Sequence, residues 1–148
     1  TIFWDEDMET VDTTLDTQIW WRPGIGRDDE LPILTALIGG KQAVKFEGMS
    51  DAEVIAAGLR DLEEMFDVDD LASHLVEGKF VAWGRDPYTL MGYSYIPIDG
   101  EGLNDALSEP IDEVLFFAGE ATHPRKFATV HGALESGLRA AEEVIDTI

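Results

Sequence analysis

The residues best suited to chemistry surround a turn in the last third of the chain. Residues 114–118 form a short continuous apolar run, typical of a strand buried on both faces, and Gly119 and Glu120 end it. Further along, Thr129 is suited to cap a helix whose free amides and partial positive charge point back toward the turn. Ligands bind at the carboxyl ends of strands in α/β sheets, so this unit predicts a site for an electron-rich ring edge. Strand, loop and helix occur together in many folds, however, and this pattern alone names no ligand.

Three aromatic residues upstream, Trp83, Tyr88 and Tyr93, are candidates for lining a ligand, with an ordinary aromatic core as the alternative. The histidines do not suggest a metal site, because His74 and His123 have no ligand partners at metal-binding spacing and the chain has no Cys. We therefore predict no metal site.

Two motifs together carry a family resemblance. Residues 115–145, LFFAGEATHPRKFATVHGALESGLRAAEEVI, closely resemble the C-terminal signature of the flavin amine oxidases. This family includes polyamine oxidases, monoamine oxidases and lysine-specific histone demethylases. The second match is WGRDPY at residues 83–88 followed by GYSY at residues 92–95, and with looser matches upstream the resemblance spans nearly the whole chain.

The resemblance implies roles for particular residues. The positions that match the cofactor-binding residues of the family are Gly119, Glu120, Ala128, Thr129, Val130, Trp83 and Tyr88. Tyr93 matches one wall of the substrate pocket in front of the flavin, and Phe127 stands where many members place a second Tyr. Gly92 stands where monoamine oxidases carry the Cys that tethers the flavin, so FAD is expected to bind noncovalently.

The implied activity is oxidation of a C–N bond in a small-molecule amine by hydride transfer to flavin N5, followed by imine hydrolysis and peroxide formation. No catalytic residue is assigned, because none of the chain's lysines can be matched to the flavin-facing Lys of the family. The dinucleotide motif is also absent: Gly24-Ile25-Gly26 lacks the third Gly and is followed by acidic residues. We therefore expect this chain to be the C-terminal half of an enzyme. Alone it is expected to be inactive, and its partner is the N-terminal half of the same protein.

Two other interpretations stay open. One is a binding or assembly module that has the same fold without the chemistry, and the missing dinucleotide motif favours it. The other is a related flavoprotein, such as an amino-acid oxidase or a carotenoid desaturase, because amine specificity depends mainly on Tyr93.

Composition restricts the partners. The formal net charge is −21, which argues against nucleic acid because few cations are present to displace counterions from phosphates. The acidic residues are spread along the chain as on a solvated surface, and a salt-rich cytoplasm is one environmental interpretation. No apolar run is long enough for a membrane span, and a cytoplasmic location is the default expectation.

The elements that must position these residues suggest an α/β (mixed α+β) chain. We predict strands at residues 17–21, 74–84 and 114–118, the end of a strand at residues 2–4, and a further apolar run at residues 31–38 closed by Gly39-Gly40. Ser50 and Glu53 form a capping-box pattern that begins a helix, whereas residues 89–97 and 101–112 are expected to be a loop and a connection.

The final helix is predicted to begin at Thr129 and to pack through an apolar face. The members of that face recur at steps of three and four: Val130, Ala133, Leu134, Gly137, Leu138, Ala141, Val144 and Ile145. Residues 1–103 are predicted to belong to a mixed-sheet substrate domain. Residues 104–148 are predicted to be the closing strand, loop and helix of an FAD domain.

Overall fold

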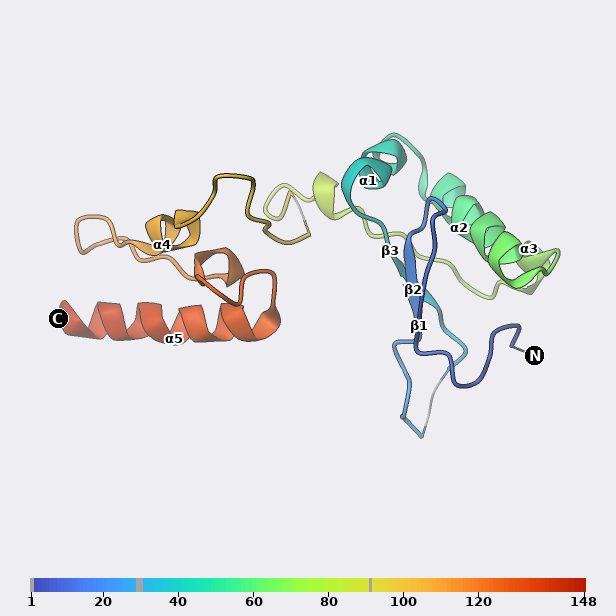
Figure 1. The fold of residues 1–148 in the computed structure, drawn as a ribbon, viewed down its shortest axis with the longest axis horizontal. Helices are drawn as coiled ribbons and strands as arrows, with labels where there is room; N and C mark the ends of the chain where they lie inside the picture. Colours follow the sequence, from blue (N-terminus) through green and yellow to red (C-terminus); the bar gives the residue numbers. More distant parts are fainter. Residues whose placement is uncertain (1, 29–30, 91) are drawn as a thin grey trace. The chain divides into compact units, whose positions relative to one another are not determined.

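The computed structural model describes residues 2–28, 31–90 and 92–148 of the chain (Figure 1). Contacts between Cα atoms divide the chain into two compact units, Thr1–Ala82 and Trp83–Ile148, and each is described by itself. The boundary predicted at residues 103 and 104 concerns the domains of a complete flavoprotein and stays a prediction.

The first unit contains a small antiparallel sheet. Its strands are β1 (Thr10–Asp12), β2 (Ile19–Trp21) and β3 (Thr35–Leu37), in the order β1-β2-β3. Val11 pairs with Trp20, which pairs with Ala36. The central strand lies within the strand predicted at residues 17–21, and β3 lies within the apolar run at residues 31–38.

Three helices follow the sheet in the same unit: α1 (Gly40–Glu47), α2 (Asp51–Phe66) and α3 (Leu71–His74). The capping box predicted at the start of α2 is confirmed, because the Ser50 hydroxyl accepts from the Glu53 amide while the Glu53 carboxylate accepts from the Ser50 amide. Gly40, which was expected only to close an apolar run, begins α1.

The core of this unit lies between α2 and the sheet. One cluster joins Trp20 of β2 to Leu62 of α2 and Leu71 of α3, and a second joins Phe46 of α1 to Val54 and Ala57 of α2. Both clusters contain residues of α2, which lie on one buried stripe of the helix. This stripe is the reason that the apolar spacing of α2 could be recognised in the sequence.

The second unit consists of loops and four helical segments. They are the 3₁₀ helices η1 (Trp83–Arg85) and η2 (Glu120–Thr122) and the α-helices α4 (Leu103–Ser108) and α5 (Val130–Asp146). Thr129 caps α5 as predicted, with its hydroxyl accepting from the Gly132 amide at 3.0 Å. The expected connection at residues 101–112 contains α4, whereas the described residues of the 89–97 loop contain neither helix nor strand.

Three predicted strands are wrong. Residues 2–4 form no strand, residues 74–84 run from the end of α3 into η1, and residues 114–118 form only an isolated bridge between Ile111 and Leu115. A strand requires a neighbour to receive its backbone hydrogen bonds, and the described residues offer none to these segments. The apolar side chains of Val114 and Leu115 are consequently exposed.

The packing face of α5 also differs from the prediction. Its buried residues are Gly132, Ser136 and Ala140, which recur one turn apart, whereas Leu134 and Leu138 of the predicted face are exposed. Small side chains let the preceding loop lie directly on the helix: a Cβ at Gly132 would stand 2.0 Å from the Lys126 carbonyl oxygen. The larger apolar stripe has no partner among the residues that the structure describes.

Helices combined with a small three-stranded sheet are consistent with the predicted α/β class. In the described part of the chain, no helix is both long enough and apolar enough to cross a membrane.

Candidate cofactor and substrate site

Glu120 is the polar centre of the candidate site. It is the first residue of η2, and its carboxylate accepts three hydrogen bonds from two other segments of the second unit. Ser94 donates its amide to Oε1 at 2.8 Å and its hydroxyl to Oε2 at 2.6 Å, and the Ala128 amide also donates to Oε2. One carboxylate therefore holds both the loop that follows Tyr93 and the turn that precedes α5.

These hydrogen bonds determine the charge state of Glu120. Partial burial of the carboxylate raises its pKa, but the Ser94 hydroxyl, the Ala128 amide and the Ser94 amide together lower it by more. The net pKa lies below the usual value, so Glu120 is ionised at neutral pH and acts only as an acceptor.

The beginning of α5 forms the second part of the site. Ala128 has a left-handed backbone with φ of 59°, and Thr129 caps the helix, so the chain turns sharply into the first helical residues. The amides of Val130 and His131 have no acceptor among the described residues. Together with the partial positive charge of a helix N-terminus, two free amides suit an electron-rich group.

An open cavity of about 480 Å³ lies beside Glu120. Its walls are formed by Thr89, Gly92, Tyr93, Ser94, Tyr95 and Glu120. Tyr93 is 58% exposed, so its ring is available to a ligand and is not explained by core packing within this unit. The structure thus brings together Tyr93, predicted from the resemblance to line the substrate pocket, and Glu120, predicted to contact the cofactor.

Other predicted residues are not brought into this cavity. Trp83 in η1, Tyr88 and Phe127 are absent from its lining, and Tyr88 is 96% exposed. Val130 is 89% exposed at the start of α5, and Gly119 precedes Glu120 with φ of 143°, a backbone conformation that favours glycine. The predicted cofactor roles of these residues, and that of Phe127 as a second pocket wall, stay predictions.

Sequence reasoning missed the residues that fix Glu120 in place. The Ser136 hydroxyl, 2% exposed on α5, accepts from the Gly119 amide at 2.9 Å. Arg139, one turn further along α5, donates to the Phe117 carbonyl at 2.7 Å and to Thr122 Oγ1 at 3.1 Å. The sequence does contain one signal for Ser136. Gly132, Ser136 and Ala140 are small residues spaced four apart, and such a stripe indicates that another segment of backbone packs closely against the helix.

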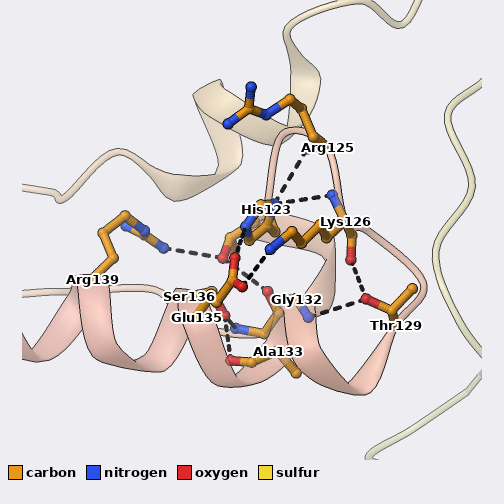
Figure 2. Close-up of polar contacts among 11 residues, drawn as sticks. His123, Arg125, Lys126, Thr129, Gly132, Ala133, Glu135, Ser136 and Arg139 are labelled. Atoms are coloured by element: carbon orange, nitrogen blue, oxygen red, sulfur yellow. Dashed lines mark hydrogen bonds and ion pairs between the residues drawn. The ribbon is translucent and has the colours of Figure 1, made fainter.

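A second polar cluster holds the loop between η2 and α5 (Figure 2). His123 Nδ1 accepts from the amides of Arg125 and Lys126, at 3.2 and 3.0 Å, while His123 Nε2 lies 2.8 Å from a Glu135 carboxylate oxygen. Lys126 pairs with the other oxygen of Glu135. The hydrogen bonds from Lys126 and His123 lower the pKa of Glu135, which keeps its carboxylate ionised as the acceptor of both. The ring of His123 thus holds the fold of this loop through both of its nitrogens.

The described residues contain no group of three or more side chains placed to hold a metal ion. His123 and Glu135 shape the loop between η2 and α5.

Comparison with known proteins identifies the family. The profile of the family described as flavin containing amine oxidoreductase matches residues 1–145. The chain belongs to this family. It is similar to lysine-specific histone demethylase 1 homolog 3 of Arabidopsis thaliana, with 32% identity over 100% of the chain and 9% of the relative.

Other relatives of the family carry similar names. The chain is 38% identical to lysine-specific histone demethylase 1 homolog 1 of Oryza sativa subsp. japonica, over 77% of the chain and 14% of the relative. It is 39% identical to histone demethylase-like protein A of Aspergillus fumigatus, over 80% of the chain and 11% of the relative. The chain therefore spans 9–14% of the length of these relatives. The description of the family names a flavin as the cofactor of its members.

Proposed function

We propose that this chain forms one wall of the flavin site and part of the substrate pocket of an FAD-dependent amine oxidase. The observation that carries the proposal is the cavity shared by Tyr93 and Glu120, in a chain that matches the flavin amine oxidoreductases over residues 1–145. The finer architecture proposed is a two-domain flavoprotein, with residues 1–103 in the substrate domain and residues 104–148 in the FAD domain.

The residues present suit one edge of FAD. The free amides of Val130 and His131 would donate to an electron-rich ring edge, and Gly119 has no atom within 4 Å of where a Cβ would lie, so its backbone is open to a close neighbour. Glu120 has about one acceptor position left after its three hydrogen bonds, enough for one hydroxyl of the cofactor. Binding would be noncovalent, since Gly92 offers no side chain for a tether.

The chemistry that FAD supplies in such a site is acceptance of a hydride from the carbon beside an uncharged amine nitrogen, after which the imine hydrolyses. The part of this chain is to orient the amine. The exposed ring of Tyr93 presents a π face that attracts a cationic amine as it arrives, and its apolar surface favours the neutral form that reacts.

The names of the relatives favour N-methylated lysine side chains as the first amines to examine. Histone tails are rich in lysine and arginine, and a chain with a formal net charge of −21 attracts such cationic peptides over long range, more strongly at low salt. This attraction raises the local concentration of substrate and does not choose among amines.

We further propose that the apolar surface of the second unit is covered by the remainder of the flavin-binding fold. Exposed apolar side chains lie on two elements of this unit: Val114, Leu115, Val130, Leu134, Leu138 and Ile145. Large apolar side chains that gather at exposed positions mark a candidate interaction surface. The relatives, which are many times longer than this chain, contain further residues that could supply the missing strands and the dinucleotide motif.

The test uses the natural gene product that contains this sequence, loaded with FAD. We expect Tyr93→Ala to lower kcat/KM for a methyl-lysine peptide by roughly one to two orders of magnitude, with flavin still bound. Tyr93→Phe is the matched control and should have a mild effect, because it keeps the ring. Peroxide release and turnover per bound flavin are the measurements.

Normal turnover per flavin in Tyr93→Ala, with reduced thermal stability and flavin content, would contradict the substrate-wall role. Activity on amino acids or on carbon–carbon bonds without activity on amines would favour the related flavoprotein instead.

A non-catalytic binding module is the second candidate. The observation that favours it is the absence from this sequence of a strand–GxGxxG–helix motif to hold the pyrophosphate of FAD. We expect the 148-residue chain alone to bind FAD poorly and to turn over no amine, and titration with FAD measures this. If the full gene product also neither binds FAD nor releases peroxide, the module interpretation replaces the oxidase.

A further inference from the structure

We propose that Glu120 is a positioning residue that couples the segment carrying Tyr93 to the turn that begins α5. The inference rests on the proposed function only where it assigns the first segment to the substrate pocket and the second to the edge of the cofactor. The physical claim is that one carboxylate, through Ser94 and Ala128, makes the two segments order together.

The first step is that the Glu120 backbone is a fixed point. Its neighbour Gly119 is bound to Ser136 of α5, and the Ala121 carbonyl accepts from Asn104 of α4 at 2.6 Å. Asn104 and Ser136 are both buried. The side chain of Glu120 therefore extends from a turn that is anchored on two helices.

The second step is that the two coupled segments have little other support. Residues 92–95 contain no helix or strand, and their only hydrogen bonds among the described residues are the two from Ser94 to Glu120. Ala128 holds a left-handed backbone, which costs free energy for a residue with a Cβ. The hydrogen bond from its amide to Glu120 offsets part of that cost, so losing the carboxylate releases both segments.

The third step is that both segments share one oxygen. The Ser94 hydroxyl and the Ala128 amide both donate to Oε2. If one donor moves, the position of Oε2 changes, and with it the geometry of the hydrogen bond from the other donor. The lowered pKa of Glu120 agrees with an ionised carboxylate that accepts all three hydrogen bonds at once. A Gln in its place has a single oxygen and an amide group that cannot accept.

The experiment is amide hydrogen exchange of the 148-residue chain by NMR at neutral pH, which requires neither FAD nor turnover. In Glu120→Gln we expect exchange at Ser94 and at Ala128 to accelerate together by about ten- to a hundredfold, the scale of a lost hydrogen bond to a charged group. The Ala140 amide on α5 reports whether the unit as a whole has loosened.

Glu135→Gln is the matched control, because Glu135 is also an ionised hydrogen-bonding carboxylate of this unit but contacts His123 and Lys126. It should leave exchange at Ser94 unchanged. Glu120→Asp, which keeps the charge on a shorter side chain, should change exchange at Ser94 and at Ala128 by similar factors, whether or not the shorter carboxylate reaches them. Acceleration at Ser94 alone or at Ala128 alone in Glu120→Gln would overturn the coupling.

A second variant keeps the inference testable if Glu120→Gln unfolds the unit. Ser94→Ala removes only the hydroxyl donor, and we expect it to accelerate exchange at Ala128 severalfold through the shared Oε2. Unchanged exchange at Ala128 in Ser94→Ala would also overturn the coupling. Because these measurements use the chain without cofactor, a failure of the amine oxidase proposal leaves their outcome unaffected, and the reverse also holds.

Discussion

Gly132 provides a sharp test of how the beginning of α5 is built. Gly is less favourable than Ala in a helix by up to about 1 kcal/mol, so propensity alone predicts that Gly132→Ala, in the first turn of α5, stabilises the protein. The structure predicts the opposite. A Cβ at this position would lie 2.0 Å from the Lys126 carbonyl oxygen and 2.8 Å from the carbonyl carbon.

The atoms in conflict are backbone, so the side chain cannot rotate away from them. Because non-bonded carbon and oxygen atoms separate to about 3.5 Å, the loop before α5 must move by more than about 1 Å. That movement disrupts the Thr129 cap, worth about 1 kcal/mol, and the charged hydrogen bond from Ala128 to Glu120, worth about 1.5–3 kcal/mol. After the helix-propensity gain is subtracted, Gly132→Ala should lower the free energy of unfolding by about 1.5–3 kcal/mol.

Gly137 on the same helix is the matched control. Nothing lies within 4 Å of the position of its Cβ, so Gly137→Ala should raise stability by about 0.5–1 kcal/mol. Urea unfolding measures the free energy of unfolding of both variants, and hydrogen exchange of the α5 amides shows whether the change lies in this helix. If Gly132→Ala proved as stable as Gly137→Ala, the close contact between the loop and α5 would be wrong, and with it the geometry of the cofactor edge.

Two further predictions concern the first unit. Thr17 is 1% exposed, and its hydroxyl accepts from Trp20 Nε1 and donates to Asp61. Thr17→Val should lower the free energy of unfolding by about 2–4 kcal/mol, and Thr17→Ser by about 1 kcal/mol, as measured by urea unfolding monitored by Trp fluorescence. Equal losses in the two variants would exclude a role for the hydroxyl. The Ser50 amide and hydroxyl lower the pKa of Glu53 below its ordinary value of 4.5, so the capping box stabilises α2 above pH 4.5 and this contribution is lost as the pH falls through the lowered pKa. Glu53→Gln should flatten that part of the pH dependence, and Ser50→Ala should speed exchange in the first turn of α2 about fivefold; an unchanged pH profile in Glu53→Gln would count against the capping contribution.

The features that could be predicted from the sequence are local ones. The capping box of Ser50 and Glu53 and the cap at Thr129 depend on residues three positions apart, so the sequence contains all of the necessary information. The strand around Trp20 could be predicted because β-branched and aromatic residues precede a Pro-Gly turn at residues 23–24. None of these features requires knowledge of what lies across the fold.

The errors share a different cause, which is that burial depends on partners distant in the chain. Residues 114–118 have the composition of a buried strand, but a strand forms only where another strand accepts its hydrogen bonds. The helical period of α5 was right. Within the described residues a different face is buried, because small residues at Gly132, Ser136 and Ala140 admit backbone that no periodicity reveals.

The candidate site shows the same division. The resemblance placed Tyr93 and Glu120 in one site, and the structure brings them to one cavity, although their roles toward substrate and cofactor stay predictions. The connection between them, Ser94, was not singled out because it lies 26 residues from Glu120 in sequence. Ser136 and Arg139 were missed for the same reason, since their hydrogen bonds join α5 to residues 17–31 positions earlier.

The two errors about burial also bear on function when they are taken together. Val114 and Leu115, exposed in the strand-like run, and the exposed stripe of α5 have the apolar composition expected of a parallel sheet and its covering helix. A sequence retains large apolar side chains at exposed positions at a cost in solubility, so their recurrence on both elements of one unit argues for a common partner surface. The same unit carries Glu120, the cavity and the free amides of α5. Covering it with the remainder of a flavin-binding fold would exclude water from the site, and hydride transfer from a neutral amine is favoured by such an apolar environment.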